Sequence, residues 1–204
     1  MKKSRLSELK KVLKLILCIV ILSGLVACSN NAKNDNKSVI SITNTNPANE
    51  TKVAVVYFSA TGNTEEVAKA IAEETKADVF EIVPEQEYSK EDLDYSNDKC
   101  RANQEMEDEA SRPSIKNDLS KVTEYDEIYL GYPIWWGTCP KIVQTFLEEY
   151  NISNSKIHAF CTSGGSGIEG SISDLQTLYP NLNIINGKRF DSVTNETIEE
   201  WIKE

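Results

Sequence analysis

Six residues between a β-branched run and a helical pattern are of types that could bind a phosphate. The segment Ser59-Ala-Thr-Gly-Asn-Thr64 offers hydroxyl groups, one amide and one glycine directly before a predicted helix. Backbone N–H groups and the helix dipole favour an anion at such a helix start, and glycine lets a ligand approach the backbone closely. The segment lacks the G-K-[ST] of a nucleoside-triphosphate P-loop. It suits a phosphate monoester held by N–H and O–H donors, although an ordinary strand-to-helix turn has a comparable composition.

Two adjacent tryptophans stand in a second segment, which could bind a flat ring. Trp135 and Trp136 lie between Pro133 and Gly137, directly after a run of strand type. Large aromatic side chains are costly to expose singly, so a loop that carries two of them needs an explanation. The pair could wall a flat aromatic ring. Alternatively, at least one of the two is a hydrophobic plug that covers the end of the sheet.

Glycine is concentrated in a third segment, Thr162-Ser-Gly-Gly-Ser-Gly167. Its glycines allow the backbone to come within hydrogen-bond reach of a ligand, although a flexible turn has the same composition. Each of the three segments follows a predicted strand. Three such loops at matching strand ends are much harder to obtain by chance than any single one.

Five short runs of β-branched and aromatic residues are the predicted strands that position these segments. They cover 52–58, 78–83, 126–132, 156–162 and 182–190. The spacing of apolar residues predicts helices after a capping Thr64 and over 140–150, 170–179 and 195–203. The alternation of strand and helix predicts a parallel sheet covered on both faces, with ligands bound at the carboxyl ends of its strands. In the charge-rich stretch 84–125 only short helices are expected.

The charge of the chain argues against one class of partner. The formal net charge is −10; residues 1–50 carry 8 of the 22 Lys and Arg and 3 of the 32 Asp and Glu, which leaves 14 and 29, a net of −15, for the remainder. Such an acidic domain repels nucleic-acid phosphates, so we expect no nucleic-acid partner. A basic protein or a neutral small molecule is easier to accept, although the acidity could equally serve solubility alone.

The histidine and cysteine content limits the chemistry further. His158 is the only histidine and falls inside a predicted strand, which argues against a Ser-His-Asp site and rules out a His-rich metal site. We therefore predict no catalytic side chain and no metal. Cys100, Cys139 and Cys161 form no C-x-x-C, so neither a metal cage nor a disulfide framework is indicated. Cys139 and Cys161 adjoin the predicted site, either as small buried residues or as redox thiols.

The first residues of the chain are typical of an export signal. A basic start leads into the apolar run Leu15–Leu22 and then into a zone of small residues, as in a secretory signal. The ending Leu25-Val-Ala-Cys28 resembles a bacterial lipobox, which implies cleavage before Cys28 and a lipid on its thiol. A plain secretory signal and an uncleaved anchor helix are the alternatives.

The domain organisation follows from this signal. We predict a lipoprotein signal peptide over 1–27 and a flexible linker over 28–50, which is rich in Asn, Ser, Thr and Lys. Residues 51–204 are predicted to form one domain. Its expected location is extracytoplasmic, anchored to the cell membrane through Cys28.

The three segments together resemble the flavodoxin family. Ser59–Thr64 resembles the flavodoxin phosphate loop T/S-x-T-G-x-T, and Pro133-Ile-Trp-Trp-Gly-Thr-Cys-Pro140 and Thr162–Gly167 resemble the two isoalloxazine loops of a flavodoxin-like branch that includes secreted lipoproteins. The resemblance extends over 52–203. It implies a doubly wound α/β sandwich with a five-stranded parallel sheet of order 2-1-3-4-5 and FMN bound without a covalent link.

The resemblance also implies which residues hold the cofactor. The FMN phosphate would be bound by Ser59, Thr61, Gly62, Asn63 and Thr64. The flavin ring would be lined on one side by Pro133, Ile134, Trp135, Trp136 and Gly137, and on the other by Thr162, Ser163, Gly164 and Gly165. Long acidic flavodoxins enclose the ring between a Trp and a Tyr, whereas the third segment here has no aromatic residue. One face of the ring is therefore expected to be more open, which would suit a second substrate.

The implied function is electron transfer through FMN at the membrane surface, to a redox protein or a small quinone-like acceptor. The flavin carries out the chemistry and the protein tunes it. In flavodoxins a backbone carbonyl of the second segment accepts a hydrogen bond from the partly reduced flavin, and Gly137 or a neighbour is the candidate here. The alternative is an FMN-dependent NAD(P)H:quinone reductase, which the open face favours. The intact phosphate segment argues against a third possibility, a binding protein that has lost its flavin.

Overall fold

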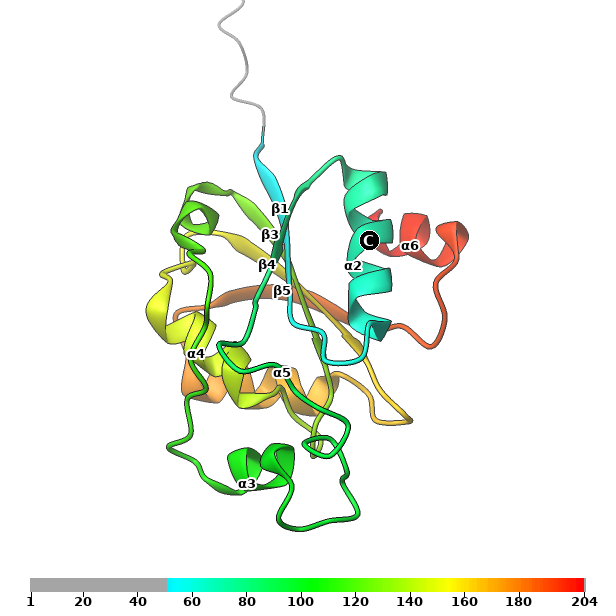
Figure 1. Ribbon diagram of the computed structural model, residues 1–204. Coiled ribbons are helices and arrows are strands. Elements are labelled where there is room, and N and C mark those ends of the chain that lie inside the picture. The colour runs from blue at the N-terminus through cyan, green and yellow to red at the C-terminus, as the bar shows by residue number, and fades with distance from the viewer. Residues whose placement is uncertain (1–50, 204) are drawn as a thin grey trace, which may run out of the picture. The chain divides into compact units, whose positions relative to one another are not determined.

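Five parallel strands form the centre of the protein. The computed structural model describes residues 51–203; the predicted signal peptide, Cys28 and the linker lie outside this part of the chain. The strands are β1 (Val53–Tyr57), β2 (Asp78–Glu81), β3 (Glu127–Pro133), β4 (Lys156–Thr162) and β5 (Asn183–Arg189). Their order is β2-β1-β3-β4-β5, and every neighbouring pair is parallel (Figure 1). The predicted sheet and its order are confirmed.

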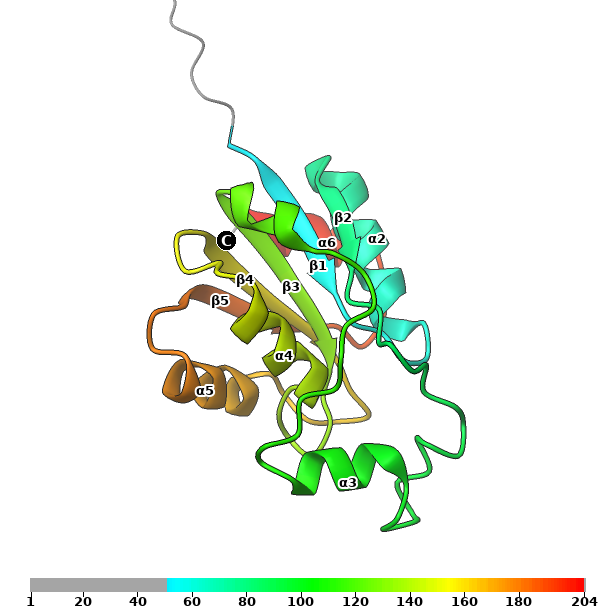
Figure 2. The same ribbon diagram turned by 60° about the vertical axis from the view of Figure 1, so that its left-hand side comes forward.

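Helices cover both faces of this sheet. They are α2 (Asn63–Thr75), α3 (Arg101–Glu107), the short 3₁₀ helix η2 (Ser120–Glu124), α4 (Lys141–Glu149), α5 (Glu169–Leu178) and α6 (Asn195–Ile202). The pair α2 and α6 lies on one face, and α4 and α5 lie on the other (Figures 1 and 2). The described part of the chain, 51–203, contains no helix with the length and hydropathy that a membrane span requires.

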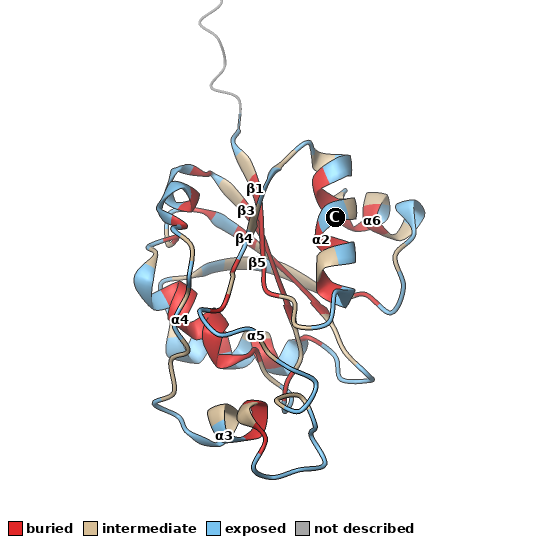
Figure 3. Cartoon of the chain, viewed as in Figure 1, coloured by how far each residue is buried: buried red, intermediate tan, exposed pale blue. Residues whose placement is uncertain are grey.

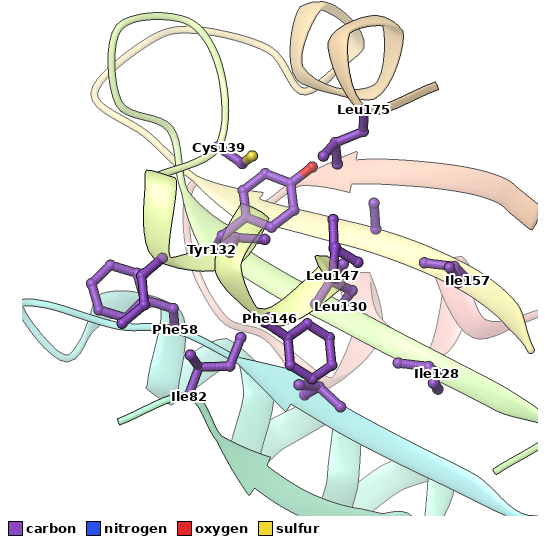
Figure 4. Packing of buried hydrophobic residues seen from close by; sticks show 14 of the residues in the cluster. Phe58, Ile82, Ile128, Leu130, Tyr132, Cys139, Phe146, Leu147, Ile157 and Leu175 are labelled. Atoms are coloured by element: carbon purple, nitrogen blue, oxygen red, sulfur yellow. The ribbon is translucent and has the colours of Figure 1, made fainter. Parts of the chain in front are cut away.

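Two hydrophobic clusters lie between the sheet and its helices, because successive side chains of a strand point to opposite faces. Val55 and Tyr57 face α2 and α6, where they join a cluster that includes the fully buried Trp201. Ala54 and Val56 face the other side and join the larger cluster. There the aromatic rings of Phe58, Tyr132 and Phe146 pack with aliphatic side chains of β3, β4 and α4 (Figure 4). Burial is concentrated in the central strands and in the inner sides of the helices (Figure 3).

The strand boundaries differ little from those predicted, but two details are corrected. The helix after β1 begins at Asn63, and Gly62 occupies the capping position, so Thr64 is inside the first turn and is not its cap. The second predicted strand ends at Glu81 rather than at residue 83. Residues 84–125 contain only the short helices α3 and η2, as expected.

His158 lies near the amino end of β4, away from the three loops, as its place in a predicted strand indicated. Its ring stacks on Tyr129 at 4.9 Å between ring centres. Its Nδ1 forms a 2.8 Å hydrogen bond with Asn186, and its Nε2 lies 3.1 Å from a carboxylate oxygen of Glu127. These contacts give the side chain a packing role in the sheet. Within residues 51–203 no cluster of His, Cys, Asp or Glu is arranged to hold a metal ion.

Candidate functional site

The three loops meet at the carboxyl ends of β1, β3 and β4. Single backbone hydrogen bonds beyond the regular strands hold the starts of these loops side by side. Phe58 donates its backbone N–H to the carbonyl of Gly131 at 2.9 Å, and Ile134 donates to Thr162 at the same distance. A cleft of about 480 Å³ opens at this edge. It is lined by Ala60, Thr61, Asn63, Glu66, Val67, Tyr95, Pro133, Ile134, Trp135, Thr162, Ser163, Gly164, Phe190, Asp191, Ser192 and Val193.

Backbone geometry shapes the first loop. Gly62 has a φ of +90°, a left-handed conformation that glycine adopts at little cost, and its N–H donates to the Ser59 hydroxyl at 3.1 Å. The Asn63 amide donates to the Thr61 hydroxyl at 3.2 Å. No side chain caps α2, so the N–H groups of its first turn are free of intrahelical and capping acceptors. The loop therefore presents donors and the positive end of a helix dipole, which suits an anion.

Two hydroxyl groups join the first loop to the third. The Oγ1 atoms of Thr64 and Thr162 lie 2.8 Å apart, although the residues are 98 positions apart in the sequence. Thr64 is almost completely buried, whereas Thr162 lines the cleft. Because each hydroxyl both donates and accepts, one proton of the pair is left for a further acceptor. The contact fixes the spacing between the two loops.

The adjacent tryptophans have different roles. Trp135 is only 4% exposed and packs edge-to-face against Phe58 and Tyr88, with ring centres 5.7 and 5.2 Å away. It is thus the plug that the sequence allowed for one of the two, and it also lines the cleft. Trp136 is 64% exposed and does not line the cleft; its indole N–H donates to Asn103 at 3.1 Å.

The third loop is tied down more firmly than a flexible turn. The Ser163 hydroxyl donates to the carbonyl of Ser166 at 2.5 Å and accepts from the Gly165 N–H at 3.3 Å. The guanidinium of Arg189, at the end of β5, donates to the Gly165 carbonyl and pairs with Asp191 at 2.7 Å. Arg189 thereby links the third loop to the segment that follows β5.

Eight of the fourteen residues predicted to hold a cofactor line the cleft: Thr61, Asn63, Pro133, Ile134, Trp135, Thr162, Ser163 and Gly164. The other six shape the loops without lining it: Ser59, Gly62, Thr64, Trp136, Gly137 and Gly165. Gly137 has a φ of +83°, and its carbonyl oxygen lies beside Gly170 of α5. The hydrogen bond that this carbonyl is expected to accept from a flavin stays a prediction.

Sequence reasoning missed three groups of lining residues. Ala60, Glu66 and Val67 lie within or next to the first loop and α2. The other two groups come from elsewhere in the chain. Phe190 to Val193 follow β5, and Tyr95 lies in the irregular stretch before α3. The position of residues 190–193 directly after the last strand was a usable signal, because the carboxyl ends of parallel strands share one edge. Tyr95 has no comparable signal, since nothing in its local sequence places it next to Trp135.

The cleft is acidic and its neighbouring thiols are inert. Within residues 51–203 the charged side chains that line it are Glu66 and Asp191. Cys139 and Cys161 are completely buried, and burial raises the pKa of each thiol to about 12. A thiol in that state is not a thiolate at neutral pH, so these cysteines are small core residues rather than redox groups. Cys100 caps α3 by accepting from the N–H of Asn103.

Comparison with known proteins relates this architecture to other chains. A candidate flavoprotein of known structure from Bacteroides uniformis ATCC 8492 is 40% identical over 76% of this chain and 99% of its own, with a TM-score of 0.73. A second one, from Bacteroides eggerthii DSM 20697, is 37% identical over 74% of this chain and 96% of its own, with a TM-score of 0.72. A flavoprotein solved in complex with FMN, from Lactobacillus acidophilus NCFM, shares the fold at 24% identity over 74% of this chain and 99% of its own, with a TM-score of 0.59.

A search of the curated proteins found no match. The family model described as flavodoxin matches residues 52–204, which include every strand of the sheet and all three loops around the cleft. With a sheet of order 2-1-3-4-5, an uncapped helix start after β1 and an aromatic wall after β3, the chain belongs to the flavodoxin family.

Proposed function

We propose that this protein binds FMN in the cleft and transfers electrons between redox partners at the membrane surface. One observation carries the proposal: the uncapped start of α2, with its left-handed Gly62, opens into the same cleft as Trp135. A phosphate site and an aromatic wall are thus combined in one cavity of about 480 Å³. That volume lies within the range of small-molecule sites, roughly 300–1,000 Å³.

The residues present fit a phosphate monoester on a flat ring. Thr61 and Asn63 bring a hydroxyl and an amide to the free N–H groups of the first turn, so the phosphate needs no lysine or arginine. Trp135 and Pro133 line the same cavity with apolar surface for a ring. Bound FMN would supply one- and two-electron chemistry, while the chain binds and orients it and tunes its charge.

Charge favours an electron carrier with a basic partner over a reductase that binds a nucleotide. Glu66 and Asp191 line the cleft, and residues 51–204 carry the excess of acidic groups described above. A negative environment disfavours a further negative charge on the cofactor, which lowers the potential for the second electron. It equally disfavours an anionic pyridine nucleotide, whereas it attracts a basic redox protein or admits a neutral quinone-like acceptor.

Attachment to a membrane through Cys28 is part of the proposal. Thr51 and Lys52 lead into the amino end of β1, at the opposite end of the sheet from the carboxyl ends of the strands (Figures 1 and 2). Residues that follow those carboxyl ends line the cleft. A tether that enters at the amino end would leave the cleft free to meet a partner. We therefore keep an extracytoplasmic, lipid-anchored carrier as the proposal.

A quinone reductase is a second candidate, which one observation favours. Phe190, Asp191, Ser192 and Val193 extend the cleft beyond the three predicted loops. This extra lining gives a second substrate a place near the cofactor. The two candidates differ in whether the cofactor passes electrons singly or in pairs.

Stepwise reduction under anaerobic conditions distinguishes the candidates. Residues 51–204 are used for this experiment, because they contain all five strands of the described sheet and the whole of the family match. We expect FMN to be retained and to accept electrons in two separate one-electron steps. Reduction in a single two-electron step, with fast reoxidation by a quinone, would favour the reductase. Failure to retain flavin at ~100 µM FMN, far above the micromolar affinity expected of such a site, would contradict both.

The first loop provides a site-specific test. Thr61→Val removes a hydroxyl that lines the cleft, whereas Thr123→Val removes one on η2 that donates to the Ser120 carbonyl. We expect Thr61→Val to raise the Kd for FMN roughly tenfold, as loss of a hydrogen bond to a charged group does. Thr123→Val should leave the Kd unchanged. Equal Kd values for both variants, measured by fluorescence titration, would place the phosphate elsewhere.

A further inference from the structure

Tyr95 lies at the mouth of the cleft although it comes from outside the three loops. It belongs to the stretch between β2 and α3, and this stretch and α3 lie beyond the carboxyl ends of the strands (Figure 2). Its side chain lines the cleft and is 49% exposed. Its ring centre is 6.3 Å from that of Trp135, with the rings inclined at 69°. Tyr95 is thus an exposed member of an aromatic cluster whose inner members are Phe58, Tyr88 and Trp135.

Asn103 holds this tyrosine in place. The side chain is 1% exposed, and its amide donates to the carbonyls of Tyr95 and Asn97 at 3.2 and 3.0 Å. Its oxygen accepts from the indole N–H of Trp136. The orientation of the carboxamide is unambiguous, because an indole N–H only donates and carbonyls only accept. A buried amide with both donors and its acceptor engaged fixes the Tyr95 loop against the loop that follows β3.

Trp136 adopts an unusual backbone conformation at this contact. Its φ of +52° is left-handed, which costs a non-glycine residue about 1–2 kcal/mol. Such conformations persist where surrounding contacts hold them. Here the conformation directs the indole toward Asn103 rather than into the cleft, so Trp136 secures the neighbouring loop while Trp135 walls the cavity.

We propose that Tyr95 stacks on the FMN ring from the side of Trp135, as a residue of the cofactor site that lies outside the three loops, and that Asn103 is its positioning residue. The inference rests on the proposed FMN function. Tyr95 packs against Trp135 in the same cleft, and it is the exposed aromatic side chain among the lining residues. A phenol ring here extends the aromatic wall of the cleft and shields the flavin from water. The stretch 84–107 thereby becomes a fourth element of the cofactor site.

Substitution of Tyr95 tests the stacking. We expect Tyr95→Ala to raise the Kd for FMN roughly threefold to tenfold, the effect of one lost aromatic pair. The emission of bound flavin should also rise, because a stacked phenol quenches it. Tyr95→Phe should keep both properties near those of the unaltered protein. Leu178→Ala is the matched control, since Leu178 is an equally exposed side chain, on α5, that does not line the cleft.

The positioning role of Asn103 is tested by substituting it both in the unaltered protein and in the Tyr95→Ala variant. Asn103→Asp keeps an acceptor for the Trp136 indole but loses both donors to the Tyr95 loop. We expect brighter bound flavin and weaker binding, and no additional change in emission when Tyr95 is already alanine. A purely structural role would change emission equally in both backgrounds and would overturn the assignment of Asn103.

The outcomes separate the two proposals. Unchanged Kd and emission in Tyr95→Ala, with FMN bound normally by the unaltered protein, would overturn the stacking of Tyr95 and leave the FMN function intact. Absence of FMN binding by the unaltered protein would overturn both. Because Tyr95 is half exposed, its substitution does not threaten the fold, and the test does not depend on Asn103 variants being stable.

Discussion

Gly62 shows how one residue shapes the turn beside the cleft. Its φ of +90° turns the chain from β1 into α2 and leaves the first N–H groups of the helix facing the cleft. A Cβ atom at this position would meet no atom within 4 Å, so the requirement for glycine is conformational and not steric. Gly164, in the third loop, also has open space around it but is not left-handed.

These two glycines give a matched pair of variants. We predict that Gly62→Ala lowers the free energy of unfolding by about 1 kcal/mol, the cost of a left-handed alanine. Gly164→Ala should change it by less than about 0.5 kcal/mol. Urea unfolding of the two variants provides the measurement. An equal loss in both would mean that the conformation of Gly62 carries no special cost.

At the scale of elements, a glycine inside β3 allows the sheet to pack against its helices. Gly131 pairs with Phe160 of β4, and a Cβ atom at residue 131 would lie 2.0 Å from the ring of Phe160. Phe160 is fully buried and packs edge-to-face against Phe190 and Trp201. Because glycine has no side chain, residue 131 of β3 leaves the space that the aromatic cluster under α2 and α6 occupies.

A double-mutant cycle tests this fit. Gly131→Ala should destabilise the protein by about 3 kcal/mol or prevent folding, because a rigid buried ring cannot move away cheaply. Phe160→Leu alone should also destabilise it, by creating a cavity. In the double variant we expect partial rescue, with a coupling of about 1–3 kcal/mol in urea unfolding. Strictly additive losses would show that the two positions do not compete for space.

For the whole molecule, buried thiols make stability depend on alkaline pH. The thiols of Cys139 and Cys161 have their pKa raised from about 9 to about 12 by burial. Above pH 9 the unfolded chain loses these protons while the folded chain keeps them, so the folded state binds more protons. Stability is therefore fully present below pH 9 and is lost as pH rises toward 12. Burial also raises the pKa of Tyr57 and Tyr129 to about 12, which extends the loss above pH 10.

We predict that the free energy of unfolding falls between pH 9 and pH 11, by up to about 1.4 kcal/mol per pH unit for each thiol. Cys139→Ala should be less stable than the unaltered protein at pH 7, but its stability should fall less steeply above pH 9. Urea unfolding at a series of pH values measures both slopes. Identical slopes would mean that Cys139 does not contribute to the alkaline loss.

The sequence by itself determined the strands, their parallel arrangement and the edge at which the three loops meet, whereas the strand order came from the resemblance to flavodoxins. The first three features follow from local patterns: strands read as apolar runs, helices as 3.6-residue periods, and a parallel arrangement places all carboxyl ends together. The turn of the first loop was equally legible, because its glycine and hydroxyl groups lie within six consecutive residues.

Only the tertiary structure decided which side chains enter the cleft. Trp135 and Trp136 are adjacent in the sequence, yet the left-handed backbone of Trp136 and its bond to Asn103, 33 residues away, send their side chains to different places. The same amide donates to the backbone carbonyl of Tyr95, whose side chain lines the cleft. Such placements depend on contacts between residues far apart in the chain, which no local pattern encodes.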